Sequence, residues 1–551
     1  MKFNQYTFLS GAFLLTFFTS HSTTHAAEVT AWIPSWGVED AFKSLKENKD
    51  SIDTLSPFWY HVNEDGTLEA VQNSEDQAII DFAKANKIPI VPTISNSFDG
   101  KKISGFLNDP VRRDENIKNI LDKVLEFNYD GIDIDYEGSL KEDTEAFTAY
   151  IKALSEVLHA QNRTLTIAVM AKSEPMMPIF GERGQDWKEL SKYVDEFRIM
   201  TYDYGWSGSN PRPVAPYYWV EEVVKYAVEH VPVEKIRLGV PFYSAAWSDN
   251  GVEGQKEFAS YTYQTIREIL EKYGVDFQYD PRQRTNRLFY LSDNDERDVV
   301  APYEVWAENH VGLEAKLNLV KKYNLGGIAI WRLGREDMEN WPVIRQMLKG
   351  EPRVEVPYFK DVSAKTRYAD SIQRLAFLGL VRGQGEMGLF DPLSKVNRAE
   401  ILKMSLNGFA VDTSKYTFPK VQTEPIQGEK EVNPFPDVSQ GAWYRAYVQT
   451  AVGEGIIEGY PDGSFKPGNN IIRVEALKLA LESAGIDLSG YDEGVWYLPY
   501  QQWALDNHLY NSGKFVPDEQ ITRAEAAYIL AKVIEAVEKE PQFSVFNKGK
   551  I

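Results

Sequence analysis

Three acidic residues alternate along one short segment of the chain. Asp133, Asp135 and Glu137 lie within residues 129–137, and one apolar or aromatic residue separates each from the next. Because side chains of a β-strand alternate between its two faces, the three carboxyl groups share one face if this segment is a strand. Burial and mutual repulsion would then keep a proton on at least one of them. Glu137, nearest the end of the strand, is best placed to keep a proton and deliver it to a leaving oxygen as a general acid.

Two other interpretations of these acids are capping or ion-paired carboxylates and a metal site. No histidine lies within or beside the segment, and a buried strand favours the perturbed carboxyl groups of a catalytic site. The chain has no cysteine, which excludes disulfides, zinc–thiolate sites and thiol nucleophiles. We therefore expect acid–base chemistry with no metal and no organic cofactor.

The scaffold that must position these acids is indicated by eight short runs rich in β-branched and aromatic residues, which alternate with longer amphipathic segments. The runs are residues 29–36, 54–62, 88–95, 129–137, 164–172, 196–204, 235–243 and 326–333. They predict an α/β fold, a (β/α)8 TIM barrel over residues 27–350, with its active site where the strands end. A doubly wound sheet is the alternative. The overlong seventh connection, residues 244–323, predicts a small α+β insertion beside the site.

The acidic segment resembles the signature of a known enzyme family. Asp130-Gly-Ile-Asp133-Ile-Asp135-Tyr-Glu137 is similar to the DGxDxDxE motif of glycoside hydrolase family 18, the chitinase family. Three further segments resemble the sixth, seventh and last strands of that family. They are Met200-Thr-Tyr202-Asp203-Tyr204, Gly239-Val-Pro-Phe-Tyr243 and Gly326-Gly-Ile-Ala-Ile-Trp331. The resemblance covers about residues 29–350.

This resemblance implies retaining, substrate-assisted cleavage of β-1,4 linkages at N-acetylglucosamine, in which the acetamide of the sugar is the nucleophile. Glu137 would protonate the glycosidic oxygen and later activate water, Asp135 would orient the acetamide, and Asp133 would tune Asp135. Tyr202 would hydrogen-bond the acetamide carbonyl. The substrate-binding residues that it implies are Asp203, Tyr204, Trp206 and Trp331. Ordinary core packing is the alternative for Tyr202 and Trp331.

The loop after the sixth run resembles one branch of the family. Tyr204-Gly-Trp206, followed by residues 213–216 and Trp219, is similar to bacterial spore-cortex and peptidoglycan N-acetylglucosaminidases. That branch often carries LysM repeats, which are not seen in this sequence, so peptidoglycan and chitin both stay open as substrates. A catalytically silent chitinase-like lectin and a structural surface-layer protein are the alternatives, and the complete set of acids disfavours both.

The sequence changes character beyond Gly350, where a linker-like stretch, residues 351–357, precedes three copies of F-x-P-x5-R-x-E. The copies resemble S-layer homology domains and predict repeats at residues 358–411, 434–487 and 490–537, the last degenerate. The resemblance implies a mostly α-helical bundle that binds an anionic secondary cell-wall polymer. The binding residues that it implies are Arg398, Arg473, Arg523 and Gly459.

Two observations limit this anchoring interpretation. Each R-x-E can instead be a pair at the start of a helix that helps the bundle to fold. The third copy lacks the F-x-D start and the Gly-Tyr turn, which predicts weak or lost binding there.

The beginning of the chain and its charge concern where the protein works. Residues 1–26 combine Lys2, an apolar run over residues 8–18 and the small residues that end at Ala26, which is typical of a secretory signal peptide. An uncleaved anchor is the alternative, although the run is short for a bilayer. A net charge of -21 disfavours nucleic acid and anionic lipid as partners. We expect a secreted protein attached to the bacterial cell wall, with no membrane span once the signal is removed.

Overall fold

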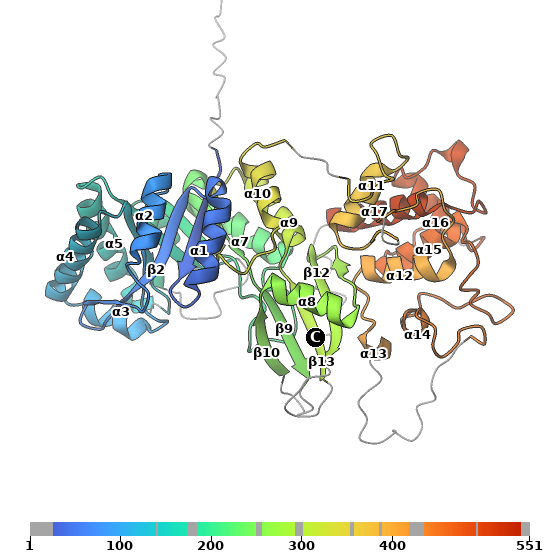
Figure 1. Cartoon of the computed structure of the whole chain (residues 1–551), viewed down its shortest axis with the longest axis horizontal. Helices are drawn as coiled ribbons and strands as arrows, with labels where there is room; N and C mark the ends of the chain where they lie inside the picture. The colour runs from blue at the N-terminus through green and yellow to red at the C-terminus, as the bar shows by residue number, and fades with distance from the viewer. Residues whose placement is uncertain are drawn as a thin grey trace, which may run out of the picture.

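The structure is a computed structural model that describes residues 26–138, 141–173, 184–249, 256–292, 301–352, 357–384, 388–417, 435–491 and 494–540. Residues 1–25 of the predicted signal peptide and residues 353–356 of the predicted linker lie outside the described residues. Figure 1 shows three parts in a row: a barrel, an antiparallel sheet and a helical C-terminal module. No helix in the described ranges is both long enough and apolar enough to cross a membrane.

Eight parallel strands close into a barrel. They are β1 (Glu28–Pro34), β2 (Thr54–Val62), β4 (Thr93–Ser95), β5 (Gly131–Asp135), β6 (Thr164–Met170), β7 (Glu196–Met200), β8 (Ile236–Pro241) and β14 (Gly327–Trp331). Strand β1 pairs with both β2 and β14, so the sheet has no open edge between them. The predicted TIM barrel is confirmed, and the doubly wound alternative is wrong because it would leave those edges unpaired.

The third barrel strand is shorter than its predicted run. Within residues 88–95 only Thr93–Ser95 forms a strand, preceded by a single bridge between Leu55 and Ile90. Pro89 and Pro92 interrupt the run, because proline has no N–H to donate to the ladder. The strand nevertheless pairs in register with β5 and ends opposite Asp135.

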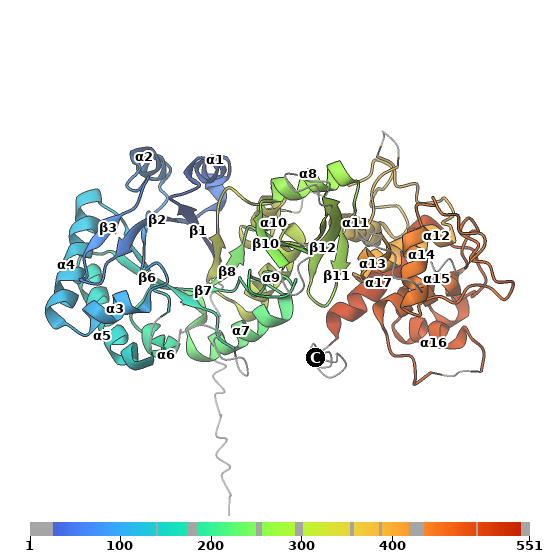
Figure 2. The same ribbon diagram turned by 90° about the horizontal axis from the view of Figure 1, so that it is seen from below.

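Helices surround the barrel and cover its apolar outer face (Figures 1 and 2). Ile132, Ile134 and Tyr136, the residues between the acids of β5, are at most 1% exposed and belong to this outer core. The alternation predicted for the segment is therefore observed. The helices are α1 (Val38–Asn48), α2 (Gln77–Asn86), α3 (Gly100–Leu107), α4 (Pro110–Phe127), α5 (Thr144–His159), α6 (Trp187–Leu190), α7 (Tyr217–His230), α9 (His310–Tyr323) and α10 (Asn340–Leu348).

The seventh connection contains the predicted α+β insertion. Its strands are β9 (Ser244–Asp249), β10 (Lys256–Tyr261), β11 (Gln278–Asp280), β12 (Thr285–Ser292) and β13 (Ala301–Ala307), and its helix is α8 (Tyr263–Tyr273). The sheet is antiparallel, in the order β10-β9-β13-β12-β11. Ile266 of α8 packs with Ala246, Leu288 and Val305 in a separate core, so the insertion has its own apolar centre.

The C-terminal module is helical, as predicted. Its helices are α11 (Ala369–Phe377), α12 (Arg398–Gly408), α13 (Ser414–Thr417), α14 (Arg445–Gly453), α15 (Arg473–Ala484), α16 (Leu498–Asp506) and α17 (Arg523–Lys539). Three of them begin at the arginines of the repeated motif. The backbone N–H of Arg398 donates to Asn469, that of Arg473 to Glu519 and that of Arg523 to Ser394. A backbone carbonyl of the following repeat therefore accepts from the start of each helix, with the first repeat serving the third, and the three close into a ring.

The inserted sheet joins the barrel to the C-terminal module (Figures 1 and 2). The hydroxyl of Tyr279, on β11, donates to Glu538 of α17 at 2.6 Å. Lys403 of α12 forms an ion pair with Asp276 at 2.6 Å. Since Tyr279 is 1% exposed, the inserted sheet and the C-terminal module meet in a buried contact, in addition to their connection through the linker.

Candidate active site

Asp133 lies at the centre of the barrel, where it accepts hydrogen bonds from three side chains and forms an ion pair with a fourth. Its Oδ2 accepts from Trp32 Nε1 at 3.0 Å and from Thr93 Oγ1 at 2.8 Å. Its Oδ1 accepts from Thr166 Oγ1 at 2.7 Å and lies 3.2 Å from Arg198 Nη1. Because every partner can donate and Asp133 is fully buried, the surroundings suit a carboxylate at this position.

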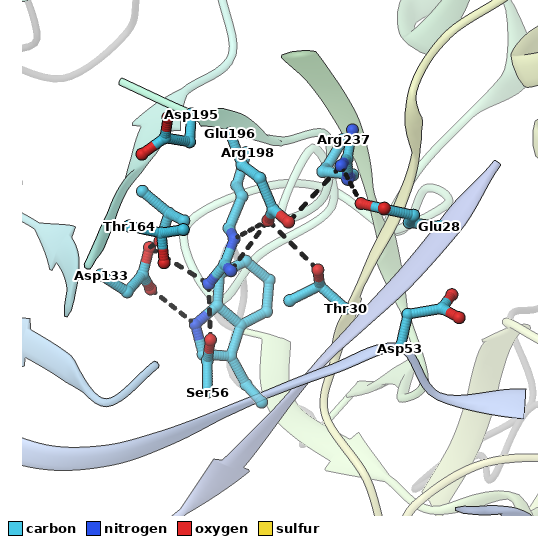
Figure 3. Close-up of polar contacts among 12 residues, drawn as sticks. Glu28, Thr30, Asp53, Ser56, Asp133, Thr164, Asp195, Glu196, Arg198 and Arg237 are labelled. Atoms are coloured by element: carbon cyan, nitrogen blue, oxygen red, sulfur yellow. Dashed lines mark hydrogen bonds and ion pairs between the residues drawn. The ribbon is translucent and has the colours of Figure 1, made fainter. Parts of the chain in front are cut away.

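Arg198 connects Asp133 to a wider buried charge network (Figure 3). Its guanidinium lies 2.8 Å from Glu196, and its Nη1 donates to Ser56 Oγ at 2.6 Å. Arg237 reaches Glu196 from the other side at 3.4 Å. Burial raises the pKa of Glu196, but the two arginines outweigh burial and hold that pKa below its usual value. Arg237 also pairs with Glu28, so two arginines and three acids form one connected network of ion pairs.

Asp135, two residues further along β5, has no such cation. It is 8% exposed, and its Oδ1 has no hydrogen-bond partner in the described part of the chain. Burial first, and then the negative charge of Asp133, raise the pKa of Asp135 to about 8. At neutral pH Asp135 therefore carries a proton, a position that the sequence analysis had considered only for Glu137.

Glu137 follows the end of β5, and its backbone is held from both sides by one amide. Its N–H donates to Asn96 Oδ1 at 2.9 Å, and its carbonyl accepts from Asn96 Nδ2 at 2.6 Å. Asn96 is fully buried and directly follows β4. Asn96 therefore fixes the position of the Glu137 backbone, from which the side chain extends. Sequence reasoning missed Asn96, although its place just beyond a barrel strand was a signal.

Tyr202 and Asp203 follow the end of β7. Tyr202 is 8% exposed, and its pKa is raised well above the usual value by burial and then by the charges of Asp135 and Asp203. The hydroxyl of Tyr243 donates to the Asp203 carboxylate. Protein around that carboxylate raises the pKa of Asp203, and the Tyr243 hydrogen bond opposes the rise. Tyr202 and the strand acids therefore lie within electrostatic reach of one another.

Trp331, the last residue of β14, belongs to an aromatic group at the ends of the strands. Its ring centroid is 5.8 Å from those of Trp32 and Phe58 and 6.2 Å from that of Trp36. Trp331 is partly exposed, and Trp36, beyond β1, is 61% exposed. These rings offer apolar faces on which a sugar can stack.

The two remaining residues predicted to bind substrate lie on the loop between β7 and α7. The hydroxyl of Tyr204 accepts from Tyr218 at 2.9 Å, and its ring is 5.2 Å from Trp219. Trp206 is half-buried in the same loop, where its backbone N–H donates to Ser209 Oγ at 3.1 Å. The side chain of Tyr204 thus contacts α7 and also Arg212 of its own loop, whose guanidinium lies 4.3 Å from the centroid of its ring. A part in substrate binding stays a prediction for both Tyr204 and Trp206.

The three arginines predicted to bind a wall polymer have different surroundings. Arg473 is 4% exposed and makes ion pairs of 2.6 Å with both Glu525 and Glu519. Arg398 Nη1 lies 3.6 Å from Glu475. These contacts fit the structural alternative for those two residues.

Arg523 differs, because it forms no ion pair among the described residues. Its guanidinium lies 4.9 Å from the centroid of the Phe390 ring, and its Nε is buried without a partner. Gly459 has a φ of +84°, and a Cβ there would lie 2.2 Å from the Phe435 ring, so the backbone itself requires glycine. Polymer binding by these residues stays a prediction.

Known proteins resemble both parts of the chain. The family described as "Glycosyl hydrolases family 18" matches residues 14–336, and the S-layer homology domain matches residues 358–402, 434–477 and 509–527. A cortical fragment-lytic enzyme of Bacillus anthracis is 29% identical over 294 residues, which are 53% of this chain and 66% of that protein. The match thus spans just under two thirds of that relative. A surface-layer 125 kDa protein of Lysinibacillus sphaericus is 26% identical over 206 residues, 35% of this chain and 16% of that protein.

Solved structures agree with the barrel. A chitinase from Chromobacterium violaceum has a TM-score of 0.54 at 25% identity, covering 59% of this chain and 99% of its own. The spore cortex-lytic enzyme SleL of Bacillus cereus has a TM-score of 0.53 at 25% identity, covering 59% and 75%. With the acids of β5 inside a closed barrel and a family match over more than half its length, this chain belongs to glycosyl hydrolase family 18 and carries S-layer homology domains at its C-terminal end.

Proposed function

We propose that the protein is a secreted, cell-surface-attached retaining glycosidase that hydrolyses β-1,4 linkages at N-acetylglucosamine in peptidoglycan or chitin. Residues 27–350 form its catalytic domain, and three repeats at residues 358–411, 434–487 and 490–537 attach it to the wall. The relatives named cortical fragment-lytic enzyme and spore cortex-lytic enzyme support a wall substrate, and the chitinase supports chitin.

The observation that carries this proposal is the contrast between the two aspartates of β5. Asp133 is surrounded by donors, whereas Asp135 has no cation beside it and a pKa raised to about 8. One proton is therefore held next to Glu137 at neutral pH. A proton stored beside a general acid keeps that acid ready to protonate a leaving oxygen.

The steps of the reaction follow from these positions. Glu137 protonates the glycosidic oxygen while the acetamide oxygen of the bound sugar attacks its anomeric carbon, which releases the leaving sugar and forms an oxazolinium intermediate. The proton that Glu137 delivers comes from Asp135, which is thereby left as an anion that orients the acetamide N–H and stabilises the positive charge that develops there. Tyr202 donates to the acetamide oxygen. Glu137 then removes a proton from water, which opens the intermediate with retained configuration.

The C-terminal module would hold the enzyme to an anionic secondary cell-wall polymer. Arg523 carries this part of the proposal, because a guanidinium without a carboxylate partner is suited to an anionic group from outside. This reverses the expectation from sequence that the third repeat binds least.

Two measurements test the proposed activity. Product analysis on peptidoglycan and on chitin oligosaccharides should give fragments that end in N-acetylglucosamine. Proton NMR of the first turnovers should show the β-anomer, as retention requires. A first product with the α-anomer would rule out the acetamide mechanism, and glycan binding without any product would favour the lectin.

A further inference from the structure

The loop that follows Trp331 carries two arginines whose guanidinium groups form no ion pair with a carboxylate among the described residues. Arg332 forms no hydrogen bond or ion pair within the described ranges, and the guanidinium of Arg335 donates to the Ser260 carbonyl, at 2.9 Å. In the whole chain 81 acidic residues face 60 lysines and arginines, so an unpaired guanidinium is not expected from composition. The loop also carries three acids, Glu336, Asp337 and Glu339, so its overall charge is not positive, but no described ion pair joins them to either guanidinium.

The position of Arg332 relates this charge to the site. It directly follows Trp331, and its guanidinium lies 5.9 Å from the centroid of the Trp36 ring. An added Cβ on Gly37 would lie 2.5 Å from Arg332 Nη1, so the side chain rests on the backbone beyond β1. Arg332 is half-buried, and the Trp36 ring beside it is 61% exposed. A ligand stacked on Trp36 would therefore reach this guanidinium.

The surrounding charges do not cancel that of Arg332. Burial first, and then the charge of Arg335, lower the pKa of Arg332 to about 10, although Asp40 and Glu336 act in the opposite direction. Glu336 is engaged elsewhere, since it accepts from Trp341 Nε1 at 3.3 Å and from the backbone N–H of Gly334. At neutral pH Arg332 is a cation whose energy an external anion would lower.

We propose that Arg332 forms a subsite for a carboxylate on the sugar next to the N-acetylglucosamine that is cleaved, and that the substrate is therefore an acidic glycan strand and not chitin. This inference rests on the proposed glycosidase function and names its substrate class. Chitin is a neutral polymer and has no carboxylate that could bind to this cation. In peptidoglycan both neighbours of each N-acetylglucosamine carry a lactyl ether, whose carboxyl group is either free or extended by a peptide that bears further carboxylates.

The test compares kcat/KM of the wild-type protein and Arg332→Gln on four soluble substrates. These are alternating N-acetylglucosamine and N-acetylmuramic acid oligosaccharides with a free lactyl carboxyl, with the same carboxyl as its methyl ester, and with a stem peptide, together with chitotetraose. Arg113→Gln, which removes an equal charge from α4, is the matched control.

We expect Arg332→Gln to lower kcat/KM about tenfold on a carboxylate-bearing strand, as for a lost charge-assisted hydrogen bond, and less than about twofold on the ester and on chitotetraose. Loss on the free-lactyl substrate assigns the subsite to that carboxyl, and loss on the peptide substrate alone assigns it to the peptide. An equal loss on all four, or none on any, overturns the proposal. If the wild-type protein cleaves none of them, the proposed function fails, and the same comparison of equilibrium binding still tests Arg332.

Discussion

The guanidinium of Arg198 lies 3.2 Å from the carboxylate of Asp133, and neither side chain is exposed to solvent. The two residues come from β7 and β5, separated in the barrel by β6. Burying both charges is costly, and their attraction offsets that cost only while both are present. Arg198 is thus a positioning residue that keeps a negative charge next to Asp135.

Loss of Arg198 should destabilise the barrel. Arg198→Met leaves Asp133 and Glu196 buried without their shared cation, which we expect to lower the free energy of unfolding by about 3–5 kcal/mol. Denaturant unfolding at pH 7 measures this, with the more exposed Arg113→Met as a control that should change it by less than about 0.5 kcal/mol. A loss below about 1 kcal/mol for Arg198→Met would mean that the buried pair contributes little.

The difference in stability between Asp135→Asn and the wild type should depend on pH. The pKa of Asp135 rises from 3.8 to about 8 on folding, so the unfolded state binds fewer protons between these values and the wild type loses stability as pH rises. Asparagine has no such penalty. Relative to the wild type, the free energy of unfolding of the variant should rise by a few kcal/mol between pH 5 and pH 8 and should rise no further above pH 8. A difference that does not change between denaturant unfolding at pH 5 and at pH 8 contradicts the raised pKa.

The charge of Asp133 should set the alkaline limit of activity. Asp133→Asn removes one of the two causes that raise the pKa of Asp135, so Asp135 should lose its proton at lower pH. The alkaline limb of the kcat/KM profile should move to lower pH, whatever the remaining rate. Asp65→Asn, an exposed acid near β3 (Leu68–Ala70), serves as control and should leave the limb in place. If the alkaline limb of the profile stays in place in Asp133→Asn, the limb reports the titration of a group other than Asp135.

Two arginines of the C-terminal module should separate folding from polymer binding. Arg473→Gln breaks two ion pairs, one of them with the 8%-exposed side chain of Glu525, and should lower stability. Arg523→Gln breaks no ion pair in the described structure and should instead weaken binding to purified cell walls. Thermal unfolding and a wall-sedimentation assay measure the two effects. The reverse pattern would assign the ligand to Arg473.

The sequence predicted the barrel, the insertion and the helical repeats because each depends on local periodicity and turn residues. It could not predict contacts between distant segments, such as that of Tyr279 with Glu538. The protonation of Asp135 was missed for a similar reason, since it depends on which of the strand acids forms an ion pair with a buried arginine. Glu196 and Arg198, two residues apart in a barrel strand, were the available signal, because alternation turns both inward.

Turnover by Glu137→Gln tests the central claim most directly. The variant keeps the shape of the side chain and removes its acid, so kcat on oligosaccharides that contain N-acetylglucosamine should fall by about 100-fold or more, while Kd for the same oligosaccharides stays within about twofold. Asn96, which hydrogen-bonds the backbone N–H and carbonyl of residue 137, should hold the glutamine in the same place. A Glu137→Gln protein with wild-type turnover would contradict the account, because another group would then be the general acid.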